Sequence, residues 1–157
     1  LRYYCYEITP ESFNQLRAAT ALYPRVICRR KGVGAQPGWM ALELAADGSA
    51  NALTPAGEGD PSQLVEVVTL DGDIAEPLTL LKMDIEGAEQ AARAGCARHI
   101  REDRPKLALS VYHNFEDIWK LPRMVEELVP GYRFYLRYHG GTGWPSEITL
   151  LALPPQA

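Results

Sequence analysis

The stretch LTLLKMDIEGAE, which runs from Leu78 to Glu89, decides the fold of this chain. Its first half, Leu78 to Met83, is a short apolar run of the kind that forms a strand buried on both faces of a parallel sheet. Two carboxylates, Asp84 and Glu86, follow where this strand would end, and Gly87 lets the backbone turn into a helix. Ligands of open α/β sheets bind beyond the carboxyl ends of the strands, so the pattern predicts a functional site at these acids.

The composition is that of an ordinary globular protein with one domain. The chain has 157 residues, of which 46% are hydrophobic and 23% are charged, and this length is enough to bury a core. Its formal net charge is -4 and its pI is about 5.4, which argues against the basic surface that nucleic acids and anionic membranes require. We therefore expect neither a nucleic-acid nor a membrane partner.

The cysteines indicate a reducing compartment. Cys5, Cys28 and Cys96 are odd in number and show no CxxC spacing, so they favour reduced and mostly buried thiols. Free thiols persist in the cytoplasm, where disulfides are rare. The sequence therefore predicts a cytoplasmic protein.

The first half of the chain predicts strands, one helix and a long loop. The helix begins at Pro10 behind Thr9, a good N-cap residue, and runs to about Leu22. A stretch rich in Gly, Ala and Pro, from Ala45 to Ser62, predicts a surface loop. The other predicted elements are strands at Leu1–Ile8, Val26–Arg29, Trp39–Leu44 and Val65–Leu70, and turns at Gly32–Gly34 and Asp71–Gly72.

The second half predicts an alternation of helices and strands that ends in a hairpin. One helix is expected from Gly87 to about Glu102, and a second covers Phe115 to Leu121, with Pro122 restarting it to Leu128. A buried strand is expected at Lys106–Tyr112, and the strands Tyr132–His139 and Glu147–Leu153 flank a Gly-rich loop at Gly140–Ser146. This order predicts an α/β fold with a mostly parallel sheet and an antiparallel edge strand.

Four motifs in this order resemble the FkbM family of S-adenosylmethionine-dependent methyltransferases. They are LLKMDIEGAE at Leu80–Glu89, PKLALSVYH at Pro105–His113, Glu116–Trp119 with Pro122, and YRFYLRY at Tyr132–Tyr138. The resemblance implies the class I methyltransferase fold, a Rossmann-like sheet with a terminal antiparallel hairpin. It also implies S-adenosylmethionine as cofactor and methyl transfer to a hydroxyl of a sugar, a polyketide or another small natural product.

One departure from the family concerns the start of the domain. Glu7 matches the family's acid at the end of the second strand, so the glycine-rich loop that precedes it by roughly 20 residues would lie upstream of Leu1. The first strand–helix unit is then missing from the chain, which leaves a gap in the sheet between the strands at Leu1 and Leu78. Unpaired central backbone groups are costly to bury, so we expect an upstream extension or another segment to fill this gap.

The resemblance gives roles to the candidate binding residues, and each role has a structural alternative. Glu7 would accept hydrogen bonds from the two ribose hydroxyls, or it is an exposed acid at a strand end. Val33 and Gly34 would lie against the adenine ring, or they form a plain turn. Asp84 and Glu86 would hold the methionine amino group, a substrate hydroxyl or a metal, or they are acids stabilised by a helix N-terminus.

His113 is the candidate general base. A neutral imidazole at the end of a strand beside Asp84 and Glu86 could take a proton from a hydroxyl nucleophile, or it could simply bond a neighbouring loop. The catalytic assignment is therefore His113, Asp84 and Glu86. Residues with weaker claims are His139, His99 as a solvated helix residue, Asp71 as a turn cap, and Trp119 and Trp144 as walls of an acceptor pocket or as core.

The predicted reaction is in-line displacement at the sulfonium methyl by a substrate oxygen, for which the protein supplies alignment, a dry pocket and a proton acceptor. Two other classes of function remain open. The chain could be a non-catalytic, methyltransferase-like module that binds a partner, which a missing first strand favours. It could also be a metal-dependent enzyme that uses Asp84, Glu86 and His113, although we assign no metal to the site from the sequence.

Overall fold

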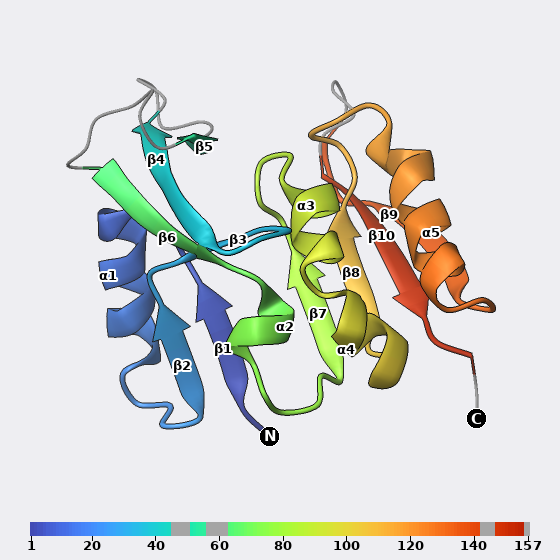
Figure 1. Cartoon of the computed structure of the whole chain (residues 1–157), viewed down its shortest axis with the longest axis horizontal. Helices are drawn as coiled ribbons and strands as arrows, with labels where there is room; N and C mark the ends of the chain where they lie inside the picture. Colours follow the sequence, from blue (N-terminus) through green and yellow to red (C-terminus); the bar gives the residue numbers. More distant parts are fainter. Residues whose placement is uncertain (45–50, 56–62, 142–146, 156–157) are drawn as a thin grey trace. The chain divides into compact units, whose positions relative to one another are not determined.

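The computed structural model describes residues 1–44, 51–55, 63–141 and 147–155. The chain divides into two compact units, Leu1–Thr69 (unit 1) and Leu70–Ala157 (unit 2). Figure 1 shows the elements of both units, and each unit is described here by itself. None of the helices within the described ranges is both long enough and apolar enough to cross a membrane.

Unit 1 opens with a strand–helix–strand motif, as the sequence predicts. Strand β1 (Tyr3–Tyr6) pairs in parallel with β2 (Val26–Arg29), and α1 (Pro10–Thr20) connects them and packs against β2. Thr9 occupies the N-cap of α1, but its hydroxyl donates to a side chain outside the helix instead of capping it. A helix between two parallel strands is the usual crossover connection.

A second, four-stranded sheet completes unit 1, in the order β3-β6-β4-β5. The pair β3–β6 is parallel, whereas β4 pairs antiparallel with both β5 and β6. The bounds are β3 (Gly32–Val33), β4 (Gly38–Leu44), β5 (Asn51–Pro55) and β6 (Leu64–Val68).

Two predictions for this region are wrong. The stretch Ala45–Ser62 is not loop throughout, because β5 forms within it and pairs with β4; residues 45–50 and 56–62 lie outside the described ranges. The predicted turn at Gly32–Gly34 is instead the short strand β3, and Gly34 continues its ladder by donating its N–H to the carbonyl of Val68 at 2.9 Å. Cross-strand pairing overrides the local Gly and Pro signals in both cases, with the neighbouring strand β4 for β5 and with the distant strand β6 for β3.

Unit 2 is built on a mixed sheet in the order β7-β8-β10-β9. Its strands are β7 (Leu80–Met83), β8 (Lys106–Ser110), β9 (Arg133–Tyr138) and β10 (Ile148–Leu153). Strands β7 and β8 are parallel, and the terminal hairpin joins β8 through β10, which is antiparallel to both of its neighbours. The expected antiparallel hairpin at the end of the fold is therefore confirmed.

The helices of unit 2 differ in detail from those predicted. The predicted turn at Asp71–Gly72 lies within the short helix α2 (Leu70–Asp73), which also takes Leu70 from the end of the predicted strand. The expected single helix after Gly87 is split into α3 (Glu89–Ala94) and α4 (Ala97–Glu102). The split has a visible cause, because the carbonyl of Gly95 accepts a hydrogen bond from the backbone N–H of Asp71 at 2.9 Å and so leaves the helical ladder.

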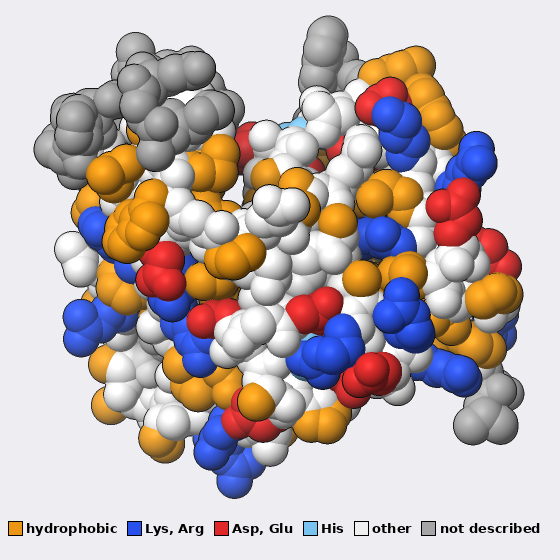
Figure 2. Space-filling view, viewed as in Figure 1, with side chains coloured by type: hydrophobic (Ala, Val, Ile, Leu, Met, Phe, Trp, Pro, Cys, Tyr) orange, Lys and Arg blue, Asp and Glu red, His pale blue; other side chains and the backbone are white. Residues whose placement is uncertain are grey.

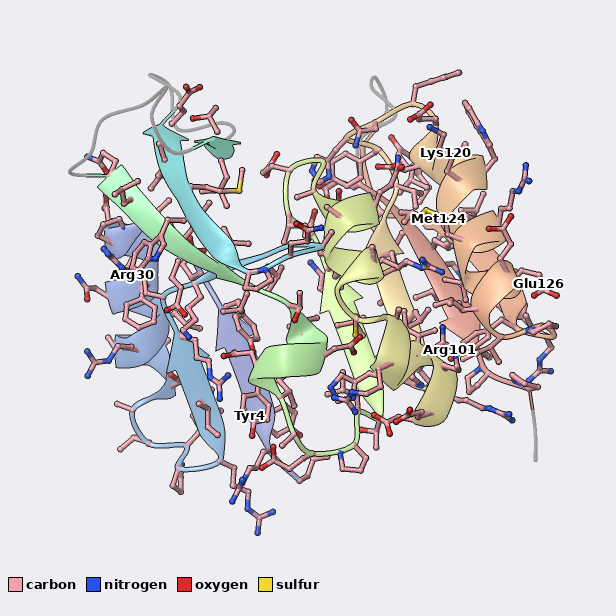
Figure 3. The ribbon with its side chains drawn as sticks, viewed as in Figure 1. Tyr4, Arg30, Arg101, Lys120, Met124 and Glu126 are labelled. Atoms are coloured by element: carbon pink, nitrogen blue, oxygen red, sulfur yellow. The ribbon has the colours of Figure 1, made fainter. Side chains whose placement is uncertain are left out.

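Helix α5 (Asp117–Leu128) runs without interruption through Pro122, where the sequence predicted a restart. A proline inside a helix removes one backbone hydrogen bond. Leu121 and Val125 on either side of it are fully buried, and their packing holds the helix together. Figure 1 shows α3, α4 and α5 on the same face of the sheet. The guanidinium of Arg93 in α3 donates to the carbonyl of Met124 in α5, the residue labelled in Figure 3.

The fold class is α/β, as predicted, but the mostly parallel Rossmann-like sheet is not observed. The strands of the described residues form three sheets, of which two mix parallel and antiparallel pairs. Strand β7 is also buried on one face only. Leu81 and Met83 face the core, whereas Leu80 and Lys82 are exposed, and the exposed fraction of Leu80 is 59%. Among the described residues β7 pairs with β8 alone, so it is an edge strand with one side unpaired.

Candidate functional site

The candidate site lies at the carboxyl ends of β7 and β8 in unit 2. These strands are parallel with Met83 opposite Leu109, so the residues that follow them emerge at the same edge of the sheet. After β7 the chain turns sharply through Glu86 and Gly87, whose φ angles are 54° and 95°. The left-handed conformation at Gly87 suits glycine, and the amide of Asn114 donates to its carbonyl at 3.0 Å.

His113 lies between three carboxylates in this turn region. Its Nε2 atom is 3.4 Å from Oε2 of Glu86 and 3.7 Å from Oδ1 of Asp84, and its Nδ1 atom is 3.0 Å from Oε1 of Glu89. The structure thus brings together His113, Asp84 and Glu86, the three residues assigned to catalysis from the sequence. An imidazole with a carboxylate on Nδ1 has that nitrogen as its donor, which leaves the Nε2 lone pair available as a proton acceptor.

Asp84 is held ionised by its neighbours. Lys82 Nζ donates to Oδ2 at 3.0 Å and the hydroxyl of Tyr112 donates to Oδ1 at 3.1 Å. Burial raises the pKa of Asp84, but the hydrogen bonds from Lys82, Ser110 and Tyr112 outweigh it and leave the pKa below its ordinary value. Burial and the hydrogen bond to Asp84 together raise the pKa of Tyr112 to about 12, so this phenol keeps its proton at neutral pH.

Glu89 is a site residue that the sequence analysis missed. It was assigned only to the helix after Gly87, yet its side chain is fully buried and its Oε1 accepts from the N–H of Ile85 at 2.9 Å while facing His113. The spacing of Glu89 was the one sequence signal for this role. It is the third acid of the stretch and lies five residues after Asp84, in the first turn of the following helix. Its contact with a histidine 24 residues away has no local sequence pattern.

A second layer of polar residues fixes the loop after β8. Asp117, which is fully buried at the start of α5, accepts hydrogen bonds from Asn114 at 3.1 Å and from Gln90 at 2.6 Å. Asn114 is therefore tied both to Gly87 and to Asp117. These contacts hold the backbone on either side of His113 and so restrict where its ring can point.

The predicted cofactor residues Glu7, Val33 and Gly34 belong to unit 1. Oε1 of Glu7 accepts hydrogen bonds from the backbone N–H and the hydroxyl of Thr9, at 2.8 and 3.1 Å, so its carboxylate is fixed at the end of β1. Gly34 is buried, and a Cβ there would lie 3.0 Å from Val67, which gives a packing reason for glycine. The roles of these three residues stay predictions, as does that of Asp84, the fourth residue assigned to the cofactor.

The weaker candidates serve the fold where the structure describes them. His99 is not solvated as predicted but fully buried, with Nδ1 2.6 Å from Asp103 and Nε2 3.1 Å from the carbonyl of Ile74. Asp71 accepts from the backbone N–H groups of Arg98 and His99 at the start of α4. His139 is exposed, Trp119 is half-exposed with its ring edge-on to Phe115, and Trp144 lies outside the described residues.

Comparisons with known proteins agree on one family. The sequence matches the family model of the methyltransferase FkbM domain over residues 2–140. Among solved structures, the chain is similar to the crystal structure of methyltransferase FkbM from Methylobacillus flagellatus KT, with a TM-score of 0.77 and 26% sequence identity. The match covers 96% of this chain and 36% of that chain, so this chain spans about a third of that protein's length. No curated protein matches it.

Proposed function

Because the chain belongs to the FkbM family of methyltransferases, we propose that it carries the catalytic acids and the proton acceptor of an S-adenosylmethionine-dependent O-methyltransferase. The observation that supports this most directly is the convergence of His113, Asp84 and Glu86 beyond the ends of β7 and β8. The acceptor would be a hydroxyl on a sugar, a polyketide or another small natural product.

The residues present fit the chemistry of the cofactor. Its methionine part carries an ammonium group, and Asp84, with a pKa below the ordinary value, offers a permanent negative charge for it. Glu7 keeps its second carboxylate oxygen, Oε2, clear of the two hydrogen bonds that Thr9 makes to Oε1, so a ribose hydroxyl has an acceptor there. Val33 and Gly34 would offer apolar surface and close backbone approach to the adenine ring.

His113 would act as the general base. When bound, S-adenosylmethionine supplies a methyl group already activated by a positively charged sulfur, so the protein needs to provide alignment and a place for the proton. Glu89 would hold the Nδ1 side of the ring, and Nε2 would accept the proton of the acceptor hydroxyl.

One face of unit 2 carries mixed charge. On the face seen in Figure 2, acidic and basic side chains lie next to one another over α3, α4 and α5. Nucleic-acid-binding proteins instead concentrate Lys and Arg on one face or along one helix. This mixed surface agrees with the net charge of -4 and favours a neutral or mixed acceptor over a polyanion.

We also propose that the free edge of β7 is completed by a parallel strand in the full methyltransferase domain. Among the described residues β7 pairs on one side only, and Leu80 stands exposed beside that edge. This chain matches only 36% of the solved relative, which therefore has further residues that could supply such a strand in that protein. Without that strand the chain would be the non-catalytic module that the sequence left open as an alternative.

Methyl transfer is tested by measuring S-adenosylhomocysteine release from S-adenosylmethionine over a panel of sugar and phenol or alcohol acceptors. The longest form of the protein that contains this chain is used, with His113→Ala as the inactive comparison. Acceptor-dependent release that His113→Ala abolishes is the expected result. Binding of the cofactor with no release over the whole panel, and no difference between the two proteins, would favour the non-catalytic alternative.

A further inference from the structure

The buried carboxylate of Glu89 has an unsatisfied oxygen. Its Oε1 is used by the N–H of Ile85 at 2.9 Å and faces His113 Nδ1 at 3.0 Å, whereas Oε2 has no hydrogen-bond partner among the described residues. The side chain of Glu89 is 0% exposed, so bulk water does not reach it. A buried carboxylate oxygen without a partner is costly, and buried charges are normally paired or coordinate a metal.

The groups around Glu89 have the spacing of metal ligands. One ligand atom from each of Asp84, Glu89 and His113 can be chosen so that all three lie within 4.8 Å of one another. Tetrahedral ligands about 2.0–2.2 Å from a Zn²⁺ ion lie about 3.3–3.6 Å apart, so the three side chains need to close by up to about 1.5 Å on an ion. Asp84 is 32% exposed at its side chain, which gives an ion a way in from solvent.

Nearby cations do not already neutralise the cluster. Lys82 bonds Oδ2 of Asp84, on the exposed side, and leaves Oδ1 facing His113 Nε2 at 3.7 Å. Glu86 adds a further negative charge 3.4 Å from the same nitrogen. Three carboxylates therefore surround one imidazole with one lysine at the margin, and this concentration of negative charge attracts a cation.

We propose that Asp84, Glu89 and His113 form a binding site for a divalent first-row transition-metal ion such as Zn²⁺ or Mn²⁺. Two carboxylates and one imidazole are ligands of these ions, whereas Mg²⁺ and Ca²⁺ are bound mainly through oxygen. Glu86 is the nearest further carboxylate and can supply a fourth ligand when its exposed side chain moves.

Metal binding regulates the proposed methyl transfer, and this consequence rests on the proposed function. An ion bound to either ring nitrogen of His113 leaves the proton of the neutral ring on the other nitrogen, so no lone pair remains to accept the proton of the acceptor hydroxyl. The bound ion therefore inhibits transfer, and removing it with a chelator restores activity. Metal binding itself needs neither cofactor nor acceptor, so the two proposals fail separately.

Isothermal titration of the whole chain with ZnCl₂ or MnCl₂, with MgCl₂ as comparison, tests the site without methyl donor. One equivalent of Zn²⁺ is expected to bind, with Mg²⁺ at least tenfold weaker, and Asp84→Asn, Glu89→Gln and His113→Ala should each weaken Zn²⁺ by at least about tenfold. The controls His139→Ala and Glu43→Gln remove an exposed imidazole and an exposed carboxylate elsewhere, and should bind as the parent does.

If Glu89→Gln does not fold, a measurement on the parent protein still tests the metal site. Paramagnetic broadening by Mn²⁺, read from the NMR spectrum of the parent protein, should affect the ring of His113 before the ring of His139. Zn²⁺ affinity that stays unchanged in Asp84→Asn and His113→Ala, or Mn²⁺ broadening that reaches His139 first, would overturn the proposed site.

Discussion

The Nδ1 atom of His113 lies 3.0 Å from Oε1 of Glu89, a carboxylate that is fully buried although it begins a helix. A buried carboxylate on one imidazole nitrogen orients the ring and selects the tautomer with its proton on that nitrogen. Glu89 is thus a positioning residue for His113, and the Nε2 atom on the far side of the ring is left facing Asp84 and Glu86.

The tautomer of His113 is the first prediction. In the parent protein, long-range ¹H–¹⁵N NMR should show His113 with its proton on Nδ1 when the ring is neutral. Glu89→Leu removes the acceptor and should give a mixture of tautomers, whereas Glu89→Gln keeps an oxygen and should restore most of the preference. Glu86→Gln is the matched control because it changes the Nε2 side. An unchanged spectrum in Glu89→Leu would show that Glu89 does not orient the ring.

His113→Ala should lower turnover far more than it lowers cofactor affinity. Loss of a general base costs about 100-fold or more in rate, and the deficit should shrink at higher pH, where the acceptor hydroxyl ionises more readily. Asp84→Asn should damage both turnover and binding, since its charge would also face the cofactor's ammonium group. Turnover of His113→Ala within a few-fold of the parent at neutral pH would make His113 a structural residue.

Gly87→Ala should destabilise the protein and distort the site. The φ angle of Gly87 is 95°, and an added Cβ would lie 3.2 Å from the Asn114 amide, so alanine is strained by about 1–2 kcal/mol in the free energy of unfolding. Gly38→Ala is the control, because a Cβ there meets no atom within 4 Å. Urea denaturation compares the two variants, and equal stabilities would contradict the importance of the turn.

Asp103→Asn should reduce stability at neutral pH and lose its effect in acid. Burial raises the pKa of Asp103, but hydrogen bonds from the N–H of Leu78 and from His99 outweigh it and lower the pKa. A carboxyl with a lowered folded-state pKa stabilises the fold above its unfolded pKa, and this stabilisation is lost as the pH falls through the folded pKa. Loss of hydrogen bonds to a charged group costs about 1–3 kcal/mol.

Urea titrations of the parent and of Asp103→Asn at several pH values measure this difference. At pH values well above the ordinary pKa of an aspartate, the free energy of unfolding of Asp103→Asn should lie below that of the parent by its largest amount. This difference should disappear as the solution becomes acid. Asp73→Asn removes the charge of a different aspartate, in α2, and its free energy of unfolding is measured for comparison with that of Asp103→Asn. A gap that widens towards low pH would mean that the charge of Asp103 does not support the fold.

The sequence was sufficient for the α/β class, the parallel pairs β1–β2 and β7–β8, the terminal hairpin and the meeting of His113 with Asp84 and Glu86. Each of these follows from short-range patterns, namely apolar runs, turn residues, and acids placed just after a strand. Parallel neighbours then bring their carboxyl ends together without further information.

Longer-range contacts decided what the sequence did not predict. The burial of His99 depends on the carbonyl of Ile74, 25 residues away, and the break between α3 and α4 depends on Asp71. Strand β5 exists because β4 offers it an edge, although its own composition favours a loop. Glu89 was hidden for the same reason, since its partner His113 lies 24 residues away in the loop after β8.

Binding of S-adenosylhomocysteine, measured by calorimetry on the longest form of the protein that contains this chain, tests the proposed function most directly. One equivalent should bind, and Glu7→Gln should weaken it at least tenfold, since a hydrogen bond to a charged group is worth about 1.5–3 kcal/mol, while the exposed control Glu11→Gln should not. The glutamine keeps an oxygen for Thr9, so the fold at the end of β1 is preserved. The absence of any saturable heat, or equal affinities in Glu7→Gln and the parent, would contradict the assignment.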